Sequence, residues 1–218
     1  MIIKFDKRYK RRINGDNMST VLDSIDGLSA EQILSKIEHP NVAVDVFQLA
    51  KKLGIKMKDV DFSTLEAGMG YPEDFVLAAI TDNDESDTLT IMLKKDLGKY
   101  KPDDKGSEEY NKILRRRQRF SVAHEIAHAA CHLSNQKDKF RVELRTDQGA
   151  ISEVDDPIEY RANVFAGELL MPKEKVLQEC KKFIFPSLNG LSEIFDVSHT
   201  VVAARLDYLG ISYIVDNK

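Results

Sequence analysis

The sequence contains no tryptophan, only two cysteines and six prolines, and no long run of apolar residues. Cys131 and Cys180 are too few for a disulfide scaffold, and they lack the CxxC spacing of a zinc knuckle. No segment approaches the ~18 apolar residues that a membrane span needs, and the apolar stretch at the start is too short for a secretory signal. We therefore expect a cytoplasmic protein whose cysteines are both reduced.

The chain also lacks an excess of charge of one sign. Its 32 basic and 36 acidic residues give a formal net charge of -4, which argues against a dedicated nucleic-acid binder. Basic residues gather at Lys7 to Arg12 and at Arg115 to Arg119, and a solvated face is the ordinary interpretation of such runs. We expect no direct nucleic-acid binding and no membrane contact.

The length of 218 residues, with 42% hydrophobic content, is enough for one sizeable core. Residues 1–40 are charged and weakly periodic, so they are interpreted as an N-terminal extension with one short helix at 30–37. Residues 41–172 form the expected core domain, and residues 173–218 form a helical C-terminal part.

The first half of the predicted core combines a helix with a small sheet. Apolar residues at helical spacing predict a helix over 42–53, which ends at Gly54 and leads into a strand at 55–60. Two more strands, 75–80 and 88–93, flank the turn-rich stretch TDNDESD and are expected to pair antiparallel. The predicted fold class is therefore α+β, with an antiparallel or mixed sheet.

The second half is predicted to be helical. Residues 108–133 have helical periodicity without proline or glycine, so they predict one long helix. Pro157 at a first helical position, a capping Asp155 or Asp156 and the stop at Pro172 predict a helix over 157–170. Three shorter helices are expected at 173–182, 187–195 and 199–209.

The last two of these helices form a helix-turn-helix pattern, which raises the possibility of DNA binding. A recognition helix presents several basic or amide side chains to a groove. Here the second helix has one basic residue, Arg205, with Asp207 close by. We therefore favour a structural or substrate-docking role. His199, at the start of this helix, is a weak candidate for stabilising an oxyanion.

The pentapeptide HEIAH at 124–128 lies within the long helix. His124 and His128 are four residues apart, about one helical turn, so both imidazoles project from one face and can bind one metal ion. Glu125 can reach a metal-bound water without being a ligand, which suits a general base. The alternative is a core helix with satisfied histidines, but burying these three side chains without a metal or partner is costly.

A catalytic zinc has three protein ligands and an open position, so a third ligand is needed. The metzincin spacing fails because its places hold Cys131 and Ser134. His132 follows on the same helix, where three ligands would splay around the surface, so it is assigned a supporting role.

Glu159, at the start of the next helix, is the better candidate for the third ligand. It completes a His, His, Glu set, and Asn163 one turn later could support a ligand histidine from the second shell. The alternative for Glu159 is an exposed first-turn glutamate favoured by the helix dipole.

Three linked stretches, RRQRFSVAHEIAHAACH, IEYRANVFAGELLMP and LSEIFDVSHTVVAARLDYLGI, resemble the ImmA/IrrE family of metallo-endopeptidases. The resemblance implies a zincin-like fold, with His124, His128 and Glu159 as Zn²⁺ ligands and Glu125 as the catalytic residue. It also implies cleavage of a helix-turn-helix transcriptional repressor, often in phage or mobile elements. Two alternatives stay open: a non-catalytic module that holds a repressor or DNA, and a general aminopeptidase, although nothing marks an amine-binding site.

Overall fold

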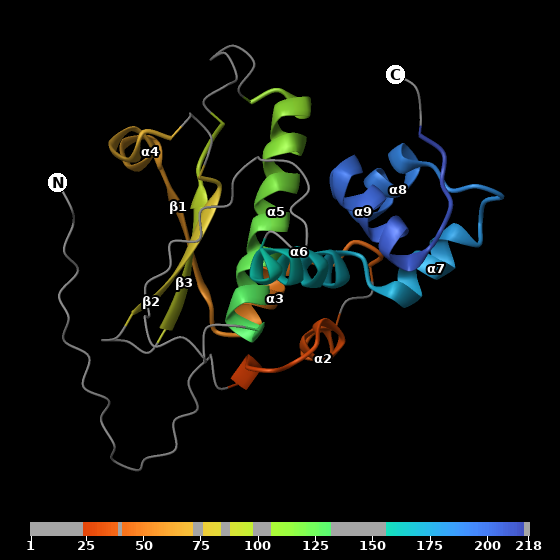
Figure 1. The fold of residues 1–218 in the computed structure, drawn as a ribbon, viewed down its shortest axis with the longest axis horizontal. Helices are drawn as coiled ribbons and strands as arrows, with labels where there is room; N and C mark the ends of the chain where they lie inside the picture. Colours follow the sequence, from red (N-terminus) through yellow and green to blue (C-terminus); the bar gives the residue numbers. More distant parts are fainter. Residues whose placement is uncertain are drawn as a thin grey trace.

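The computed structural model describes residues 24–38, 41–71, 76–83, 88–97, 106–131 and 156–215. A three-stranded sheet of β1 (Lys56–Val60), β2 (Ala78–Asn83) and β3 (Thr88–Lys94) packs against the long helix α5 (Glu108–Cys131). Figure 1 shows α6 (Pro157–Leu170) crossing α5, with α7 (Lys173–Cys180), α8 (Leu188–Phe195) and α9 (His199–Leu209) gathered beyond it. The α+β class is confirmed, and the arrangement is consistent with a zincin-like fold.

The sheet is mixed, with strand order β1-β3-β2. β2 and β3 pair antiparallel as expected, whereas β1 pairs parallel to β3. β2 begins at Ala78 and continues to Asn83, so the predicted end at Ile80 was wrong. Its polar last three residues are held by the ladder to β3, since main-chain pairing does not require apolar side chains. The predicted start of this strand, Phe75, lies outside the described residues.

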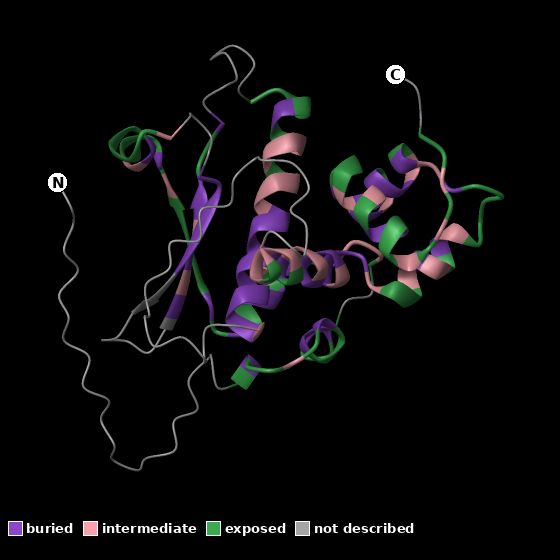
Figure 2. Cartoon of the chain, in the orientation of Figure 1, coloured by how far each residue is buried: buried purple, intermediate pink, exposed green. Residues whose placement is uncertain are grey.

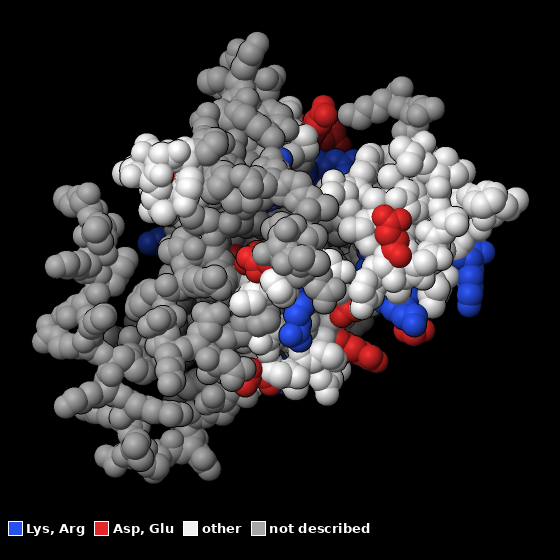
Figure 3. Space-filling view, viewed as in Figure 1, with Lys and Arg blue, Asp and Glu red and all other residues white. Residues whose placement is uncertain are grey.

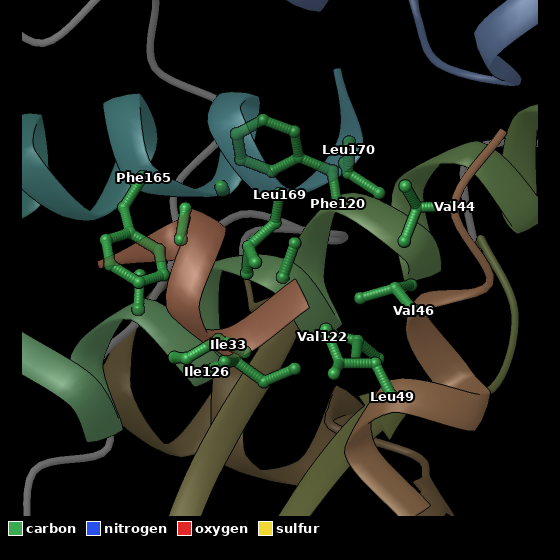
Figure 4. Packing of buried hydrophobic residues seen from close by; sticks show 14 of the residues in the cluster. Ile33, Val44, Val46, Leu49, Phe120, Val122, Ile126, Phe165, Leu169 and Leu170 are labelled. Atoms are coloured by element: carbon green, nitrogen blue, oxygen red, sulfur yellow. The ribbon is translucent and has the colours of Figure 1, made fainter. Parts of the chain in front are cut away.

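The core lies between the sheet, α5 and α6. Alternation along β3 turns Leu89, Ile91 and Leu93 toward α5, where they join the main hydrophobic cluster. Figure 4 shows apolar side chains of α5, α6 and the segments before the sheet meeting in this cluster. Figure 2 shows that the buried residues of α5 concentrate in its second half. The buried half of α5 is the half that carries HEIAH, so the pentapeptide is part of the packed interior.

Short helices precede the sheet in the described part of the chain. α3 (Val46–Lys52) begins four residues later than predicted, because the Asp45 carboxylate caps it by accepting from the Gln48 N–H at 2.9 Å. α2 (Ala30–Leu34) has a capping box formed by Ser29 and Gln32 and packs against α6. Several apolar residues between positions 25 and 37 therefore belong to the main hydrophobic cluster. The division of the chain at residues 40 and 172 stays a prediction.

A further helix, α4 (Ser63–Met69), was not predicted. Its buried Glu66 accepts a hydrogen bond from the Val76 N–H at 2.7 Å and forms an ion pair with the buried Lys94 of β3, with both Nζ–Oε distances at 3.0 Å. This paired charge anchors α4 to the end of the sheet.

α8 and α9 form the expected helix-turn-helix pair. Asp196, in the turn, has φ 53° and ψ 51°, the left-handed conformation that an aspartate tolerates better than most residues. Its carboxylate accepts two hydrogen bonds from Arg115 of α5, at 2.9 and 2.7 Å. Arg116 and Arg119 of α5 bind the carbonyls of Ser192 and Asp196, both at 3.0 Å. Part of the basic run at 115–119 therefore fastens α8 to α5 rather than forming a purely solvated face.

We predict that Asp196→Asn destabilises the protein by about 1–3 kcal/mol at neutral pH, because the arginines lose their counter-charge while the turn keeps a residue that tolerates its conformation. Burial opposes ionisation of Asp196, but the surrounding arginines outweigh it and hold the pKa of this carboxyl below its usual range. A lowered folded-state pKa contributes stability above the unfolded pKa of about 3.9, and that contribution is lost as the pH falls through the folded value.

Urea unfolding at several pH values measures this effect. The difference between the wild-type and Asp196→Asn proteins should be largest near neutrality and shrink below about pH 4. Asp59→Asn, at an exposed position of β1, is the matched control and should leave stability unchanged. A pH-independent difference would contradict the electrostatic explanation.

Within the described ranges, no helix is both long enough and apolar enough to cross a membrane.

Candidate metal centre

α5 places two imidazoles in the interior. His124 and His128 lie one turn apart on the helix and are 1% and 0% exposed. The ring of Phe120, one turn earlier, lies 6.2 Å from the His124 ring between centroids. Because the helix is packed on both sides by the sheet and α6, the two rings are held in a fixed direction.

α6 supplies a carboxylate from its first turn. Asp156 is the N-cap, and its side chain accepts hydrogen bonds from the N–H groups of Ile158 and Glu159, both at 3.2 Å. Pro157 follows at the first helical position, as predicted. The cap fixes the backbone at Glu159, and the crossing of the two helices turns its side chain toward the histidines.

The three side chains converge. The Nε2 atoms of His124 and His128 are 2.8 Å apart, and the Glu159 carboxylate oxygens lie 3.2 Å from His124 Nε2 and 3.3 Å from His128 Nε2. One ligand atom from each residue lies within 4.8 Å of the others. Two imidazole nitrogens and one carboxylate oxygen make up a donor set that suits a catalytic zinc, which takes three protein ligands.

Glu159 is not an exposed first-turn glutamate, since its side chain is 19% exposed. Burial would raise the pKa of this carboxyl, but hydrogen bonds from His124 and His128 together outweigh it and hold the pKa well below its usual range. The carboxyl is therefore ionised at neutral pH, which is the state that a metal ligand requires.

Glu125 is fully buried beside the two histidines in the sequence of α5. It follows His124 directly and precedes His128 by three residues, so it lies on an adjoining part of the same helical surface. The observed geometry brings together His124, His128 and Glu159, with Glu125 next to them on α5.

Three further residues, Asn163, His132 and His199, are candidates for supporting roles. Asn163 lies one turn after Glu159 and is partly buried, but among the described residues it makes no hydrogen bond to His124 or His128. Its supporting role stays a prediction. His132 lies outside the described residues. His199 is exposed at the start of α9, away from the three converging side chains on α5 and α6.

Two contacts that brace the site were not evident from the sequence. Gly27, with φ 70°, donates its N–H to the carbonyl of Ala130 at 2.8 Å, which binds the N-terminal segment to the last turn of α5. Arg205 of α9 is buried and donates to the Met171 carbonyl at 3.0 Å and to Glu168 at 3.3 Å, at the far end of α6. α5 is therefore held two residues after His128, and α6 is held at the end opposite Glu159.

An α+β fold with a histidine pair on one helix and a carboxylate from a second, crossing helix is typical of metallopeptidase sites. Residues 115–207 match the model of the Peptidase_M78 family, described as the IrrE N-terminal-like domain, from the first turns of α5 to the end of α9. This match confirms the resemblance to the ImmA/IrrE family, and it indicates that the segment is a metallopeptidase domain. No curated protein matches the chain.

Proposed function

We propose that the protein is a zinc-dependent endopeptidase that hydrolyses a peptide bond in a protein partner. The convergence of His124, His128 and Glu159, with an ionised carboxylate among them and the buried Glu125 alongside, carries the proposal. The metallopeptidase family of residues 115–207 supports it independently.

The two histidines and Glu159 would hold the ion. Zinc in such a site lowers the pKa of a bound water and polarises a carbonyl oxygen. The chain's own contribution is to fix the three donor atoms, because α5 is held before and after the histidines by Arg115 and Ala130, and α6 is held at its C-terminal end by Arg205. Fixed donors avoid the cost of reorganising the site during the reaction.

Glu125 would act as the general base. Its carboxylate would accept the proton of the attacking water and then donate it to the leaving amine nitrogen, so that the carboxylate is regenerated at the end of each cycle.

The proposed substrate is a helix-turn-helix transcriptional repressor of the cytoplasm, carried by a phage or mobile element, as the family resemblance implies. The structure supports a protein rather than DNA as the partner of α8 and α9. Arg205 is buried against α6, and Arg115, Arg116 and Arg119 bind the α8–α9 turn, so these cations are engaged within the chain.

Incubation of the purified protein with a helix-turn-helix protein encoded beside its gene tests the proposal. We expect a single cut, located by mass spectrometry, which a zinc chelator prevents and added zinc restores. A stable complex that is never cut would contradict the endopeptidase proposal and favour a non-catalytic binding module. Cleavage that persists in the presence of the chelator would show that the reaction does not require a metal.

A further inference from the structure

Five exposed apolar residues gather at one edge of the helical C-terminal part. Ile184, in the connection between α7 and α8, is 94% exposed, and Val215, near the end of the chain, is 64% exposed. We call this surface the C-terminal apolar patch. Its members are Phe183, Ile184, Phe185, Ile214 and Val215. Isolated exposed apolar residues are ordinary, but a contiguous group at one edge marks an interaction surface.

Hydrogen bonds join the two segments of the patch. The Ile214 N–H donates to the Pro186 carbonyl at 2.9 Å, and the Leu188 N–H donates to the Ile214 carbonyl at 3.1 Å. These bonds form a parallel bridge between Ser187 and Ile214. The two segments of the patch are therefore joined at a single β-bridge.

The C-terminal segment of this bridge, residues 213–215, has an open edge. Because backbone polar groups alternate along a strand, the groups of Ile214 face Ser187, and those of Tyr213 and Val215 face the opposite way. In the described part of the chain, the N–H groups of Tyr213 and Val215 make no hydrogen bond. An exposed apolar strand with an open edge is a template for pairing with another chain.

The position and border of the patch indicate what covers it. In Figure 1 the α7–α8 connection and the C-terminal segment lie at the outer edge of the helical part, on the side away from the α5–α6 crossing, so the patch does not continue the metal centre. Figure 3 shows this edge as white, with blue side chains below it. Lys181 is exposed beside the patch and Lys182 pairs with Glu179 at 2.6 Å. An apolar centre with a polar rim is the usual composition of a protein interface.

We propose that the C-terminal apolar patch is the interface of a homodimer. The open edges of two copies pair antiparallel about a two-fold axis. The patch of one copy then lies against the same patch of the other, so no second type of surface is needed. Two aromatic and three branched aliphatic side chains expose on the order of 500 Å² per copy, or about 1,000 Å² for the pair. That area is at the low end for specific interfaces, so the dimer is weak, with a Kd in roughly the micromolar range.

Sedimentation velocity on the full chain tests the proposal. Between about 1 and 300 µM, which brackets micromolar dissociation constants, the wild-type mass should rise from monomer toward dimer. The double variant Ile184→Asp, Phe185→Asp should raise the Kd at least about 10-fold, because the dimer would bury unpaired carboxylates. Val215→Pro, which removes an N–H of the open edge, should weaken the dimer as well.

The control is Met69→Asp, which places a carboxylate at an exposed apolar position of α4 and should not change the Kd. Circular dichroism of each variant verifies that the fold is kept. A wild-type protein that stays monomeric over the whole range would overturn the proposal, and so would a dimer that survives the double substitution. A dimer that is lost in the double variant but unchanged in Val215→Pro would refute the strand pairing.

Discussion

Glu125→Gln is expected to abolish peptide hydrolysis while the protein keeps its fold and its metal. Glutamine has nearly the same shape and can still form hydrogen bonds, but it cannot take a proton from water. General base catalysis contributes about 10²–10⁴-fold, so we expect a loss of at least about 100-fold in the rate of cleavage. Cleavage of the partner protein under single-turnover conditions measures the loss.

The matched control is Glu109→Gln, the same substitution at an exposed position of the same helix. It should leave the rate unchanged. Zinc content and the thermal unfolding midpoint should agree among the wild type and both variants. If Glu125→Gln cleaves at more than about a tenth of the wild-type rate, Glu125 is not the general base.

Glu159→Ala is expected to lower the zinc affinity by at least about 100-fold, because it removes one of the three proposed ligands and the only carboxylate among them. Competition with a chromophoric chelator measures the dissociation constant directly. Since a ligand that binds only the folded state stabilises it, zinc at about 100 times the wild-type Kd should add roughly 2.7 kcal/mol to wild-type stability and much less to the variant.

Glu174→Ala, at an exposed position of α7, is the control for this substitution and should retain wild-type affinity. An unchanged zinc affinity in Glu159→Ala would mean that another residue is the third zinc ligand. His132 would then be the first candidate to replace.

Helices with strong local signals were predictable from the sequence. Pro157 and the capping Asp156 mark the start of α6, and its end at Leu170 precedes Pro172, so the predicted bounds agree with the structure. The spacing within HEIAH and the resemblance of three linked stretches to a known family predicted that His124, His128 and Glu159 converge, and their distances agree. These features depend on neighbouring residues or on linked motifs, which a sequence displays directly.

Features that depend on distant contacts were not predictable. Glu66 belongs in the interior because Lys94 meets it from a strand 28 residues later, and nothing in the stretch STLEAGM indicates that partner. The arginines at 115–119 resemble a solvated run until Asp196 is placed beside them. The helix near residue 30 is different, because its start has a local signal in the sequence: Ser29 and Gln32 form a capping box before two apolar residues.

Diffraction from zinc-loaded crystals at the zinc absorption edge tests the central claim most directly. The structure predicts one strong anomalous peak, about 2.0–2.2 Å from the Nε2 atoms of His124 and His128 and from a carboxylate oxygen of Glu159. A peak bound by other residues, or one that Glu159 does not contact, would contradict the proposed metal centre.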